Sequence, residues 1–253
     1  MIDIGAGRGI ISNALIPYCN NVFAYEVDRD LIHSLELIES PKFILRNENF
    51  LDTNINKINK PIKVFSNIPF FLTADILRKL FVENSNIDSG YIIMEKETAW
   101  RFIGKPYKKN SVISILIGLR YKARIIWEFK RTDFIPVPNA NIVLVEFVKK
   151  GQFIFDILKC RDFIAYIFNE RKGAIKNSLY IFWRYEKVKS ILKSAGIKLN
   201  EKVSDLDVDG WLKVLNEFTK LPKEKQYVVT GEYAKLMRHQ QKLNSDKNIA
   251  YNE

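Results

Sequence analysis

A glycine-rich loop lies between an apolar strand and a helix at the start of the chain. Met1–Ile4 predicts a buried strand, Gly5, Gly7 and Gly9 follow at alternate positions, and the apolar spacing of Ile10–Pro17 predicts a helix. Glycines in such a loop let the chain turn sharply and let its backbone approach a ligand closely. This strand–loop–helix unit is typical of α/β folds that bind a ligand outside the carboxyl ends of their strands.

The next predicted strand ends near an acidic side chain. Val22–Val27 is apolar apart from Glu26, and a carboxylate at the end of the second strand is the arrangement that binds ribose hydroxyls. The Gly-x-Gly-x-Gly spacing differs from the Gly-x-Gly-x-x-Gly of dinucleotide-binding loops. It therefore favours an adenosine ligand without a pyrophosphate, of which S-adenosylmethionine is the common one. Asp3, just before the loop, either orders the loop or holds the ammonium group of such a ligand.

The tetrapeptide Asn67-Ile68-Pro69-Phe70 follows an apolar run at Ile62–Phe65, so we expect it at the carboxyl end of another strand. An amino group on a nucleobase is a poor nucleophile because its lone pair is delocalised into the ring. The Asn67 side-chain oxygen and the carbonyl of Ile68 or Pro69 can each accept an N–H bond and turn that lone pair towards an electrophile. Phe70 offers a face for a base taken out of its stack.

An Asn-containing turn over a buried Phe would explain this tetrapeptide by itself. Its order after a glycine loop and an acidic strand end favours a site that binds a nucleobase amine. Catalysis at such a site rests on proximity and orientation rather than on a strong base.

Strand and helix patterns alternate through about residue 150. The alternation predicts a mostly parallel, doubly wound sheet with an antiparallel pair of strands at one edge. Further strands are expected at Phe43–Leu45, Ile62–Phe65, Tyr91–Met94, Arg124–Phe129 and Ile142–Phe147. Further helices are expected at Asp30–Ile38, Thr73–Val82 and Lys96–Ile103.

The pattern becomes helical after Lys150, with apolar residues at Phe153, Ile157 and Ile164. Beyond Pro222 the chain is polar and charged, which is typical of a frayed or disordered end. Three parts are therefore expected: a sheet domain over residues 1–150, a small helical domain over 151–221, and a flexible tail over 222–253.

The net charge of +11 is concentrated in one stretch of the chain. Between Lys96 and Arg131, ten Lys or Arg stand against two acidic residues. Such a stretch beside a base-binding site suits a nucleic-acid backbone, and a solvated basic face is the plainer explanation. The candidates for contact with RNA phosphates are Lys96, Arg101, Lys105, Lys108, Lys109 and Arg131.

Other features bear on compartment and metal chemistry. No apolar run reaches the ~18 residues of a membrane span, and no secretory signal is visible, so we expect a cytoplasmic protein without a membrane partner. Cys19 and Cys160 are too isolated for a disulfide framework, and His33 and His239 are far apart, so we expect no metal site.

Four motifs occur in the order found in the rRNA adenine N6-methyltransferases: Asp3–Gly9, then Glu26, then Asn67–Phe70, and finally Asp133–Pro138. The chain resembles this family over roughly residues 1 to 220. The resemblance implies a Rossmann-like, class I S-adenosylmethionine-dependent methyltransferase sheet. It also implies a small C-terminal helical domain that helps to form an RNA-binding cleft, and a monomer.

The family has two main branches, the erythromycin-resistance (Erm) methylases of large-subunit rRNA and the housekeeping dimethylases of small-subunit rRNA. Ile68 in place of Leu, and the late segments Ala195–Asn200 and Trp211-Leu212, look more like the Erm branch. The resemblance therefore implies N6-mono- or dimethylation of one adenine in large-subunit rRNA, with resistance to macrolides, lincosamides and streptogramins. A small-subunit dimethylase is the nearest alternative.

The resemblance also assigns roles to individual residues. Phe134 is expected to form an aromatic sandwich with Phe70 around the extruded adenine, and packing in the core is its plainer explanation. The expected catalytic residues are Asn67, Ile68, Pro69, Phe70 and Phe134. The expected cofactor-binding residues are Asp3, Gly5, Gly7, Gly9, Glu26, Asn49 and Asn67.

Two features depart from the family pattern. Family members carry a segment before the glycine strand that closes over the cofactor, whereas this sequence begins at the strand, so we expect weaker cofactor binding. Asn49 stands where the family usually has an Asp for the cofactor adenine, and its amide oxygen can accept the same hydrogen bond without the charge.

Two functions from other classes remain open. One is a catalytically silent RNA-binding protein on the same fold, as known for mitochondrial relatives. The other is a small-molecule methyltransferase, against which the basic stretch and the tetrapeptide count, because small substrates need no surplus of phosphate-binding charge.

Overall fold

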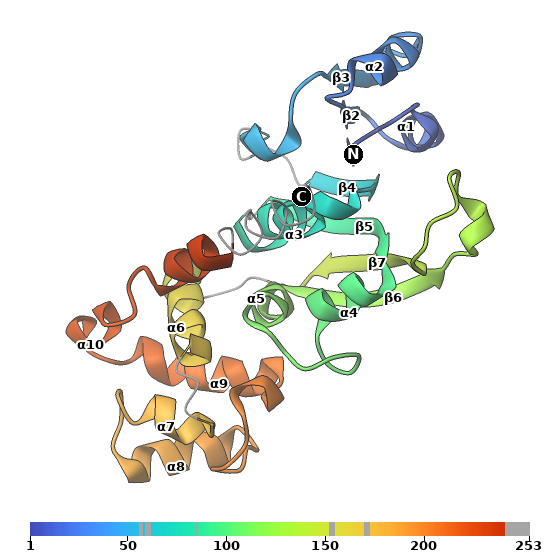
Figure 1. The fold of residues 1–253 in the computed structure, drawn as a ribbon. Helices are drawn as coiled ribbons and strands as arrows, with labels where there is room; N and C mark the ends of the chain where they lie inside the picture. Colours follow the sequence, from blue (N-terminus) through green and yellow to red (C-terminus); the bar gives the residue numbers. More distant parts are fainter. Residues whose placement is uncertain (56–57, 59–61, 84–85, 152–154, 170–172, 241–253) are drawn as a thin grey trace, which may run out of the picture. The chain divides into compact units, whose positions relative to one another are not determined.

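The computed structural model describes residues 1–55, 58, 62–83, 86–151, 155–169 and 173–240. The chain divides into two compact units. The sheet unit comprises residues 1–103 and 120–151, and the helical unit comprises residues 104–119 and 152–253 (Figure 1). In the described ranges, every helix is too short or too polar to span a bilayer.

Seven strands of the sheet unit form one mixed sheet in the order β3-β2-β1-β4-β5-β7-β6 (Figure 1). The pairs from β3 to β5 are parallel, and β7 lies antiparallel to both β5 and β6. This confirms the predicted parallel sheet with an antiparallel edge. The strands are β1 (Ile2–Ile4), β2 (Val22–Tyr25), β3 (Phe43–Arg46), β4 (Ile62–Asn67), β5 (Ile87–Glu95), β6 (Tyr121–Glu128) and β7 (Ile142–Lys149).

Helical segments of the sheet unit alternate with the strands, as the sequence predicts. The helix that follows β4 is regular in α3 and ends in η5, a π-helical turn. These segments are α1 (Ile10–Leu15), η1 (Ile16–Tyr18), α2 (Arg29–Glu36), η2 (Phe50–Asp52), η4 (Phe70–Leu72), α3 (Thr73–Arg78), η5 (Lys79–Glu83), α4 (Lys96–Ile103) and η6 (Arg131–Asp133).

An aromatic cluster fixes the π-helical turn on the sheet. The Phe81 ring stacks on Phe147 of β7 at 4.2 Å between centroids and meets Tyr121 of β6 edge to face at 5.0 Å. Gly90 of β5 makes this approach possible, because a Cβ there would lie 2.4 Å from Cζ of Phe81. Large side chains at this position of β5 would therefore displace the helix that begins at the tetrapeptide.

Parallel pairing brings the carboxyl ends of β1 to β5 to one edge of the sheet. The connection between β6 and β7 lies at the same edge, because Glu95 at the end of β5 pairs with Ile142 at the start of β7. The glycine loop, Glu26, Asn49, Asn67 and Phe134 all lie in segments that leave this edge, so the candidate site residues share one side of the sheet.

Aromatic rings also form the core of the helical unit. Phe163 stacks on Phe218 at 4.0 Å and contacts Phe182 and Trp211 edge to face. All four side chains are almost fully buried. The elements are α5 (Val112–Arg120, whose last residue belongs to the sheet unit), α6 (Ile157–Asn169), α7 (Ile175–Leu179), α8 (Tyr185–Ser194), η7 (Val203–Asp205), α9 (Val208–Thr219) and α10 (Lys223–Tyr227).

The division differs from the predicted sheet domain over residues 1–150, because residues 104–119 group with the helical unit. The Asn110 amide donates to the Leu206 carbonyl at 2.6 Å, and its backbone N–H donates to the Ser204 carbonyl. A Cβ on Gly118 would lie 2.6 Å from Val208, so α5 and α9 pack closely. The apolar α5 is a helix that the alternation pattern does not predict.

The predicted flexible tail over 222–253 needs correction in its first part. Residues 223–227 form α10, and residues 232–240 are also helical. The Asp162 carboxylate accepts N–H bonds from Gly231 and Tyr233 at 3.0 and 3.1 Å, while Val229 and Tyr233 are buried. Burial of these two side chains outweighs the polar composition of the segment. Residues 241–253 of the predicted tail, and Phe153 of the predicted helical pattern, lie outside the described residues.

Candidate active site

The glycine loop and the tetrapeptide touch at Gly5 and Pro69. Gly5 has a φ of 68°, and a Cβ there would lie 3.2 Å from Cδ of Pro69. A side chain at Gly5 would thus strain the backbone and crowd the tetrapeptide. The Gly5 and Ala6 N–H groups both donate to the Tyr25 carbonyl at the end of β2, at 2.8 and 3.1 Å. The loop is therefore held between the ends of β2 and β4.

The Glu26 carboxylate gathers three backbone N–H groups. Its Oε2 accepts from Gly7 at 2.8 Å, and its Oε1 accepts from Val27 at 2.8 Å and from Asp28 at 3.0 Å. Glu26 is only 7% exposed. A carboxylate has roughly four acceptor positions, so it retains capacity for a further donor. Glu26 thus ties the glycine loop to the turn before α2.

Asp3 is a buried carboxylate with one unused oxygen. Ser12 of α1 donates to its Oδ2 at 2.7 Å, while Oδ1 has no hydrogen-bond partner among the described residues. Burial raises the pKa of Asp3 to about 6, and hydrogen bonds from Ser12 oppose this rise. An unused carboxylate oxygen under a glycine loop is a candidate acceptor for a cationic ligand group.

Replacement of Asp3 by Asn is expected to raise the thermal stability of the ligand-free protein at neutral pH. The pKa of Asp3 is 3.8 in its ordinary state and about 6 here, so the stabilisation from its bound proton is complete below about pH 4 and is lost as pH rises through about 6. This loss is on the order of 3 kcal/mol at pH 7.5, and Asn avoids it because it carries no charge.

The measurement is the melting temperature of both proteins between about pH 4 and pH 8. The variant should melt higher at the upper end and alike at the lower end, while its affinity for S-adenosylmethionine falls. A variant that melts below the wild type at pH 7.5 would contradict the burial cost.

Asn67 presents an unused acceptor at the end of β4. Its Oδ1 is buried and has no hydrogen-bond partner in the described part of the chain. The preceding residue, Ser66, fixes the strand, because its Oγ accepts from the Ile4 N–H at 3.0 Å and donates to the Ile4 carbonyl at 2.6 Å. The side chain of Asn67 is thus positioned by a rigid neighbour while its own oxygen remains available.

The structure distinguishes the two carbonyls that follow Asn67. The Pro69 carbonyl accepts from the Leu72 N–H at 3.0 Å and from the Thr73 hydroxyl at 3.3 Å, so it caps the next helix. The Ile68 carbonyl accepts no hydrogen bond from any described residue. Of the two carbonyls that the sequence leaves open, Ile68 is the one available to a ligand.

The two predicted aromatic residues lie on different segments of this edge. Phe70, at the start of η4, is 41% exposed. Phe134 is half-buried, and its ring meets Phe129 edge to face at 5.4 Å. Both rings therefore have an available face, and each is positioned by its own segment.

Asn49 acts as a cap in the structure. Its Oδ1 accepts the Leu51 N–H at 3.0 Å at the start of η2. If this oxygen also accepts a hydrogen bond from a cofactor adenine, as predicted, it must do so while it accepts the Leu51 N–H. Asn49 is exposed. The donor half of the amide carries no such bond to a described residue.

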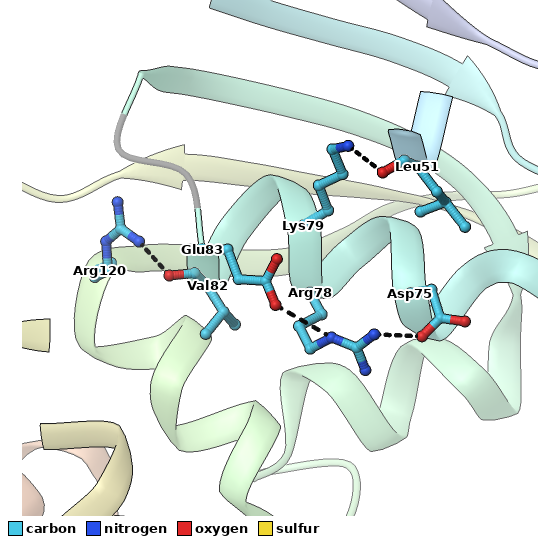
Figure 2. Close-up of polar contacts among 7 residues, drawn as sticks. All are labelled: Leu51, Asp75, Arg78, Lys79, Val82, Glu83 and Arg120. Atoms are coloured by element: carbon cyan, nitrogen blue, oxygen red, sulfur yellow. Dashed lines mark hydrogen bonds and ion pairs between the residues drawn. The ribbon is translucent and has the colours of Figure 1, made fainter. Parts of the chain in front are cut away.

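Lys79 links the helix after the tetrapeptide to the turn at Asn49. Its ammonium donates to the Leu51 carbonyl at 2.5 Å and lies 5.3 Å from the centre of the Phe50 ring. Figure 2 shows Lys79 reaching from the π-helical turn to Leu51. Phe50 in turn packs edge to face on Tyr25, the residue before Glu26, at 5.2 Å. Desolvation lowers the pKa of Lys79, and the carboxylates of Asp52 and Glu83 oppose this.

Ion pairs and a carbonyl contact brace the same helix. Arg78 pairs with Asp75 at 2.5 Å and with Glu83 at 3.4 Å, and Arg120 donates to the Val82 carbonyl at 2.9 Å (Figure 2). Arg120 is 6% exposed, so it is a structural cation that caps the π-helical turn. Arg120 lies in the predicted basic stretch, but its charge has a structural role that does not require RNA.

Replacement of Lys79 by Met is expected to weaken S-adenosylmethionine binding by about tenfold, since a charged hydrogen bond that holds the Asn49 turn is lost. The Met side chain keeps the contact with Phe50 but lacks the donor. Lys79→Arg should restore most of the affinity, and Lys42→Met, at an exposed position, should change nothing. Calorimetric titration gives the dissociation constants. Equal affinity in Lys79→Met and wild type would show that the turn at Asn49 keeps its conformation without the Lys79 hydrogen bond.

The predicted RNA-contacting residues differ in whether their side chains already form hydrogen bonds or ion pairs within the protein. Lys96 pairs with Glu128 at 2.6 Å and lies over the Trp100 ring, and Arg131 donates from Nε to the Pro138 carbonyl at 2.7 Å. Lys105 donates to the Asp205 carbonyl within the helical unit. All of the set except Lys96 are exposed, and Arg101, Lys108 and Lys109 are the members whose side chains make no hydrogen bond or ion pair with a described residue.

Ser12, Ser66 and Lys79 were not predicted as site residues. Ser66 directly precedes the tetrapeptide, and its place in the motif is the one sequence signal for it. Ser12 and Lys79 lie on helices, and only the folded chain brings Ser12 to Asp3 and Lys79 to the Leu51 carbonyl.

Similarity to known proteins agrees with this geometry. The family model described as ribosomal RNA adenine dimethylase matches residues 1–220. A relative from Mycoplasma mobile, named ribosomal RNA small subunit methyltransferase A, is 32% identical over 212 residues, which are 83% of each chain. A relative from Bacteroides fragilis, named rRNA adenine N-6-methyltransferase, is 27% identical and covers 89% of this chain and 85% of its own.

Two solved structures share the fold. The 23S rRNA methyltransferase ErmE superposes with a TM-score of 0.75 at 20% identity, covering 85% of this chain and 88% of its own. A dimethyladenosine transferase from Plasmodium falciparum gives a TM-score of 0.70 at 17% identity, covering 87% of this chain and 89% of its own.

The mixed seven-stranded sheet is that of a class I S-adenosylmethionine-dependent methyltransferase. Within that class, the chain belongs to the ribosomal RNA adenine dimethylase family. The predicted fold class and the predicted family are confirmed.

Proposed function

We propose that the chain transfers methyl groups from S-adenosylmethionine to the N6 amine of an adenine in rRNA, and that small-subunit rRNA is its substrate. The observation that carries the proposal is the buried Oδ1 of Asn67, which has no hydrogen-bond partner among the described residues and lies beside a glycine loop. A buried acceptor without a partner costs about 1–3 kcal/mol, and a ligand amine removes that cost.

The residues at the carboxyl edge fit S-adenosylmethionine. Asp3 has an unused oxygen for the ammonium group, and Glu26 has acceptor capacity for a ribose hydroxyl. Gly7 leaves room for a ligand above the loop, because a Cβ there would meet no described atom nearer than 4.0 Å. The Asn49 side-chain amide faces solvent at the end of β3 and can contact the adenine ring. When bound, the cofactor supplies an electrophilic methyl group on a sulfonium.

Asn67 and Ile68 would orient the acceptor amine. The Asn67 Oδ1 and the Ile68 carbonyl each accept one N–H bond of the adenine amine, so that its lone pair points away from both and towards the glycine loop. Two acceptors draw the N–H electrons towards nitrogen and make it more nucleophilic. Phe70 and Phe134 would hold the base by its faces. No side chain at this edge needs to act as a strong base.

RNA binding would use the exposed basic residues. Arg101 on α4, and Lys108 and Lys109 in the helical unit, are available to phosphates, whereas Lys96 and Arg131 already have partners and would contribute less. The helical unit is thus proposed to take part in binding the RNA backbone.

The choice of subunit changes the expectation drawn from the late motifs. The relative that is 32% identical is named as a small-subunit enzyme, and the similarity to ErmE, at 20% identity, concerns the fold. Identity over 212 residues outweighs the Erm-like features at Ile68, Ala195–Asn200 and Trp211-Leu212, which cover only a few positions. At position 68 in particular, Ile and Leu differ little in volume and polarity.

Methyl transfer to separated rRNAs tests the proposal. Tritium from labelled S-adenosylmethionine should enter small-subunit rRNA, whether protein-free or in assembled subunits, and primer extension should locate it at one or two adenines. Label only in large-subunit rRNA would reassign the substrate. No label in either RNA, from folded protein that binds the cofactor, would refute the enzyme function.

Large-subunit rRNA is the second candidate. The relative from Bacteroides fragilis carries a name without a subunit, and the motifs at Ile68 and Ala195–Asn200 favour the Erm branch. Under this alternative, expression in a sensitive bacterium would raise the tolerated concentration of a macrolide, a lincosamide and a streptogramin together. Small-subunit methylation predicts no such change.

A further inference from the structure

The connection between β6 and β7 carries a fully exposed isoleucine. Ile135 is 100% exposed, and Val137 in the same connection is 55% exposed. The connection lies at the edge where β4 delivers Asn67. Ile135 and Val137 together expose apolar surface in one short loop beside the candidate site, and a partner that covered this surface would gain the free energy of its burial.

Three contacts brace the loop. The Lys130 N–H donates to the Asp133 carboxylate at 2.9 Å, and Arg131 reaches across the loop from its Nε to the Pro138 carbonyl at 2.7 Å. Phe134 packs edge to face on Phe129. The Arg131 contact joins the two ends of the segment that contains Ile135, so the exposed side chain lies on a loop with restricted backbone motion. Bracing of this kind lowers the entropic cost of inserting the side chain into a partner.

The backbone turns Ile135 away from its neighbour. Phe134 is extended, with φ of −121° and ψ of 146°, and successive side chains on extended backbone point to opposite sides. Phe134 faces Phe129, so Ile135 faces solvent on the other side. Phe134 and Ile135 therefore point to different sides of the loop.

We propose that Ile135 is a wedge that enters the RNA base stack in the place of the extruded adenine. The inference rests on the proposed function, because it requires an adenine that leaves its stack. Removal of a base exposes the faces of its neighbours, and apolar side chains such as Ile are used to fill or open base steps. The ligand of this subsite is thus the pair of base faces beside the target nucleotide.

Phe71 is the competing residue for this task. Its side chain is 86% exposed and follows Phe70 directly. Phe71 lies on the short helix η4, and the described contacts show no bracing of its ring. The Phe71→Ser variant therefore serves as a comparison within the same edge, and Leu37→Ser serves as a control at an 80% exposed position on the end of α2.

The test uses an RNA hairpin that contains the methylated position once the wild type has located it. With 2-aminopurine at that position, binding of wild-type protein should raise fluorescence several-fold, because the base leaves its stack. Ile135→Ser should lose most of this rise at saturating protein, Ile135→Leu should keep it, and Leu37→Ser should match the wild type. The exposed position of Ile135 means that the variant should fold normally.

A second arm measures methyl transfer. Ile135→Ser should lower kcat/KM about tenfold on a hairpin with a stacked target adenine, and by less than twofold when that adenine is already bulged out. An unchanged fluorescence rise in Ile135→Ser, or a loss found only in Phe71→Ser, would overturn the wedge. Failure of the proposed function would appear separately, as a wild type that neither methylates rRNA nor raises the fluorescence.

Discussion

Replacement of Asn67 by Ala is expected to lower kcat for methyl transfer by about 10²–10³-fold, the usual cost of removing one preorganised polar group at a reacting centre. The Oδ1 of Asn67 has no partner among the described residues, so its one evident task is to receive a donor from a ligand. Removal of that oxygen leaves the Ile68 carbonyl as the single acceptor for the amine, and the lone pair is then free to rotate out of line.

The same variant should keep its stability, because no hydrogen bond from the Asn67 side chain to a described residue is lost. Its melting temperature is expected to equal or exceed that of the wild type. Asn216→Ala, at an exposed position of α9, is the matched control and should retain full activity. Single-turnover rates and melting curves on the same preparations test both expectations. A fall in the methyl-transfer rate of less than fivefold would contradict a role for Asn67 in the reaction.

The sheet could be predicted from the sequence because its signals are local. The strand expected at Ile62–Phe65 occurs and extends to Asn67, and the helix expected at Lys96–Ile103 occurs with those bounds. The position of β7 between β5 and β6 depends on pairing between distant segments, which local spacing does not encode. The apolar α5 was missed for a related reason, because a helix without a polar face lacks the amphipathic period.

The motifs place the candidate site residues at one edge of the sheet, but they do not predict the bonding between them. The motifs identify Asn67, Glu26 and Asp3, yet the commitment of the Pro69 carbonyl to the helix that follows is visible only in the folded chain. Lys79 is a stronger example. Nothing around it in the sequence suggests a site residue, because its partner at Leu51 is brought near by the packing of η5 against η2.

In the polar segment from residue 222, the sequence predicts too little structure. Composition favours a flexible tail there, but buried Val229 and Tyr233 anchor its described part, and the Asp162 carboxylate accepts the backbone N–H groups of Gly231 and Tyr233. A few apolar side chains decide such a segment, and composition averaged over many residues hides them.

Replacement of Glu26 by Gln is expected to weaken S-adenosylmethionine binding by about 100-fold, because charged hydrogen bonds to ribose are worth about 1.5–3 kcal/mol each. The variant should also melt several degrees lower. A Gln side chain offers one oxygen where Glu26 uses two, so its NH₂ group must face either the Gly7 N–H or the N–H groups of Val27 and Asp28. One or more backbone donors then remain unsatisfied.

Calorimetric titration and melting curves separate these two effects, with Glu36→Gln, on the exposed side of α2, as the matched control. A lower melting temperature with unchanged affinity would limit Glu26 to ordering the loop.

The bonding in the free protein favours a double role. Three of roughly four acceptor positions on the carboxylate are occupied, whereas the two hydroxyls of a ribose require two. Cofactor binding is therefore expected to release one backbone N–H, and that of Gly7 is the single donor to Oε2. A shift of the Gly7 amide resonance on titration with the cofactor would report this exchange, and it should be absent in Glu26→Gln.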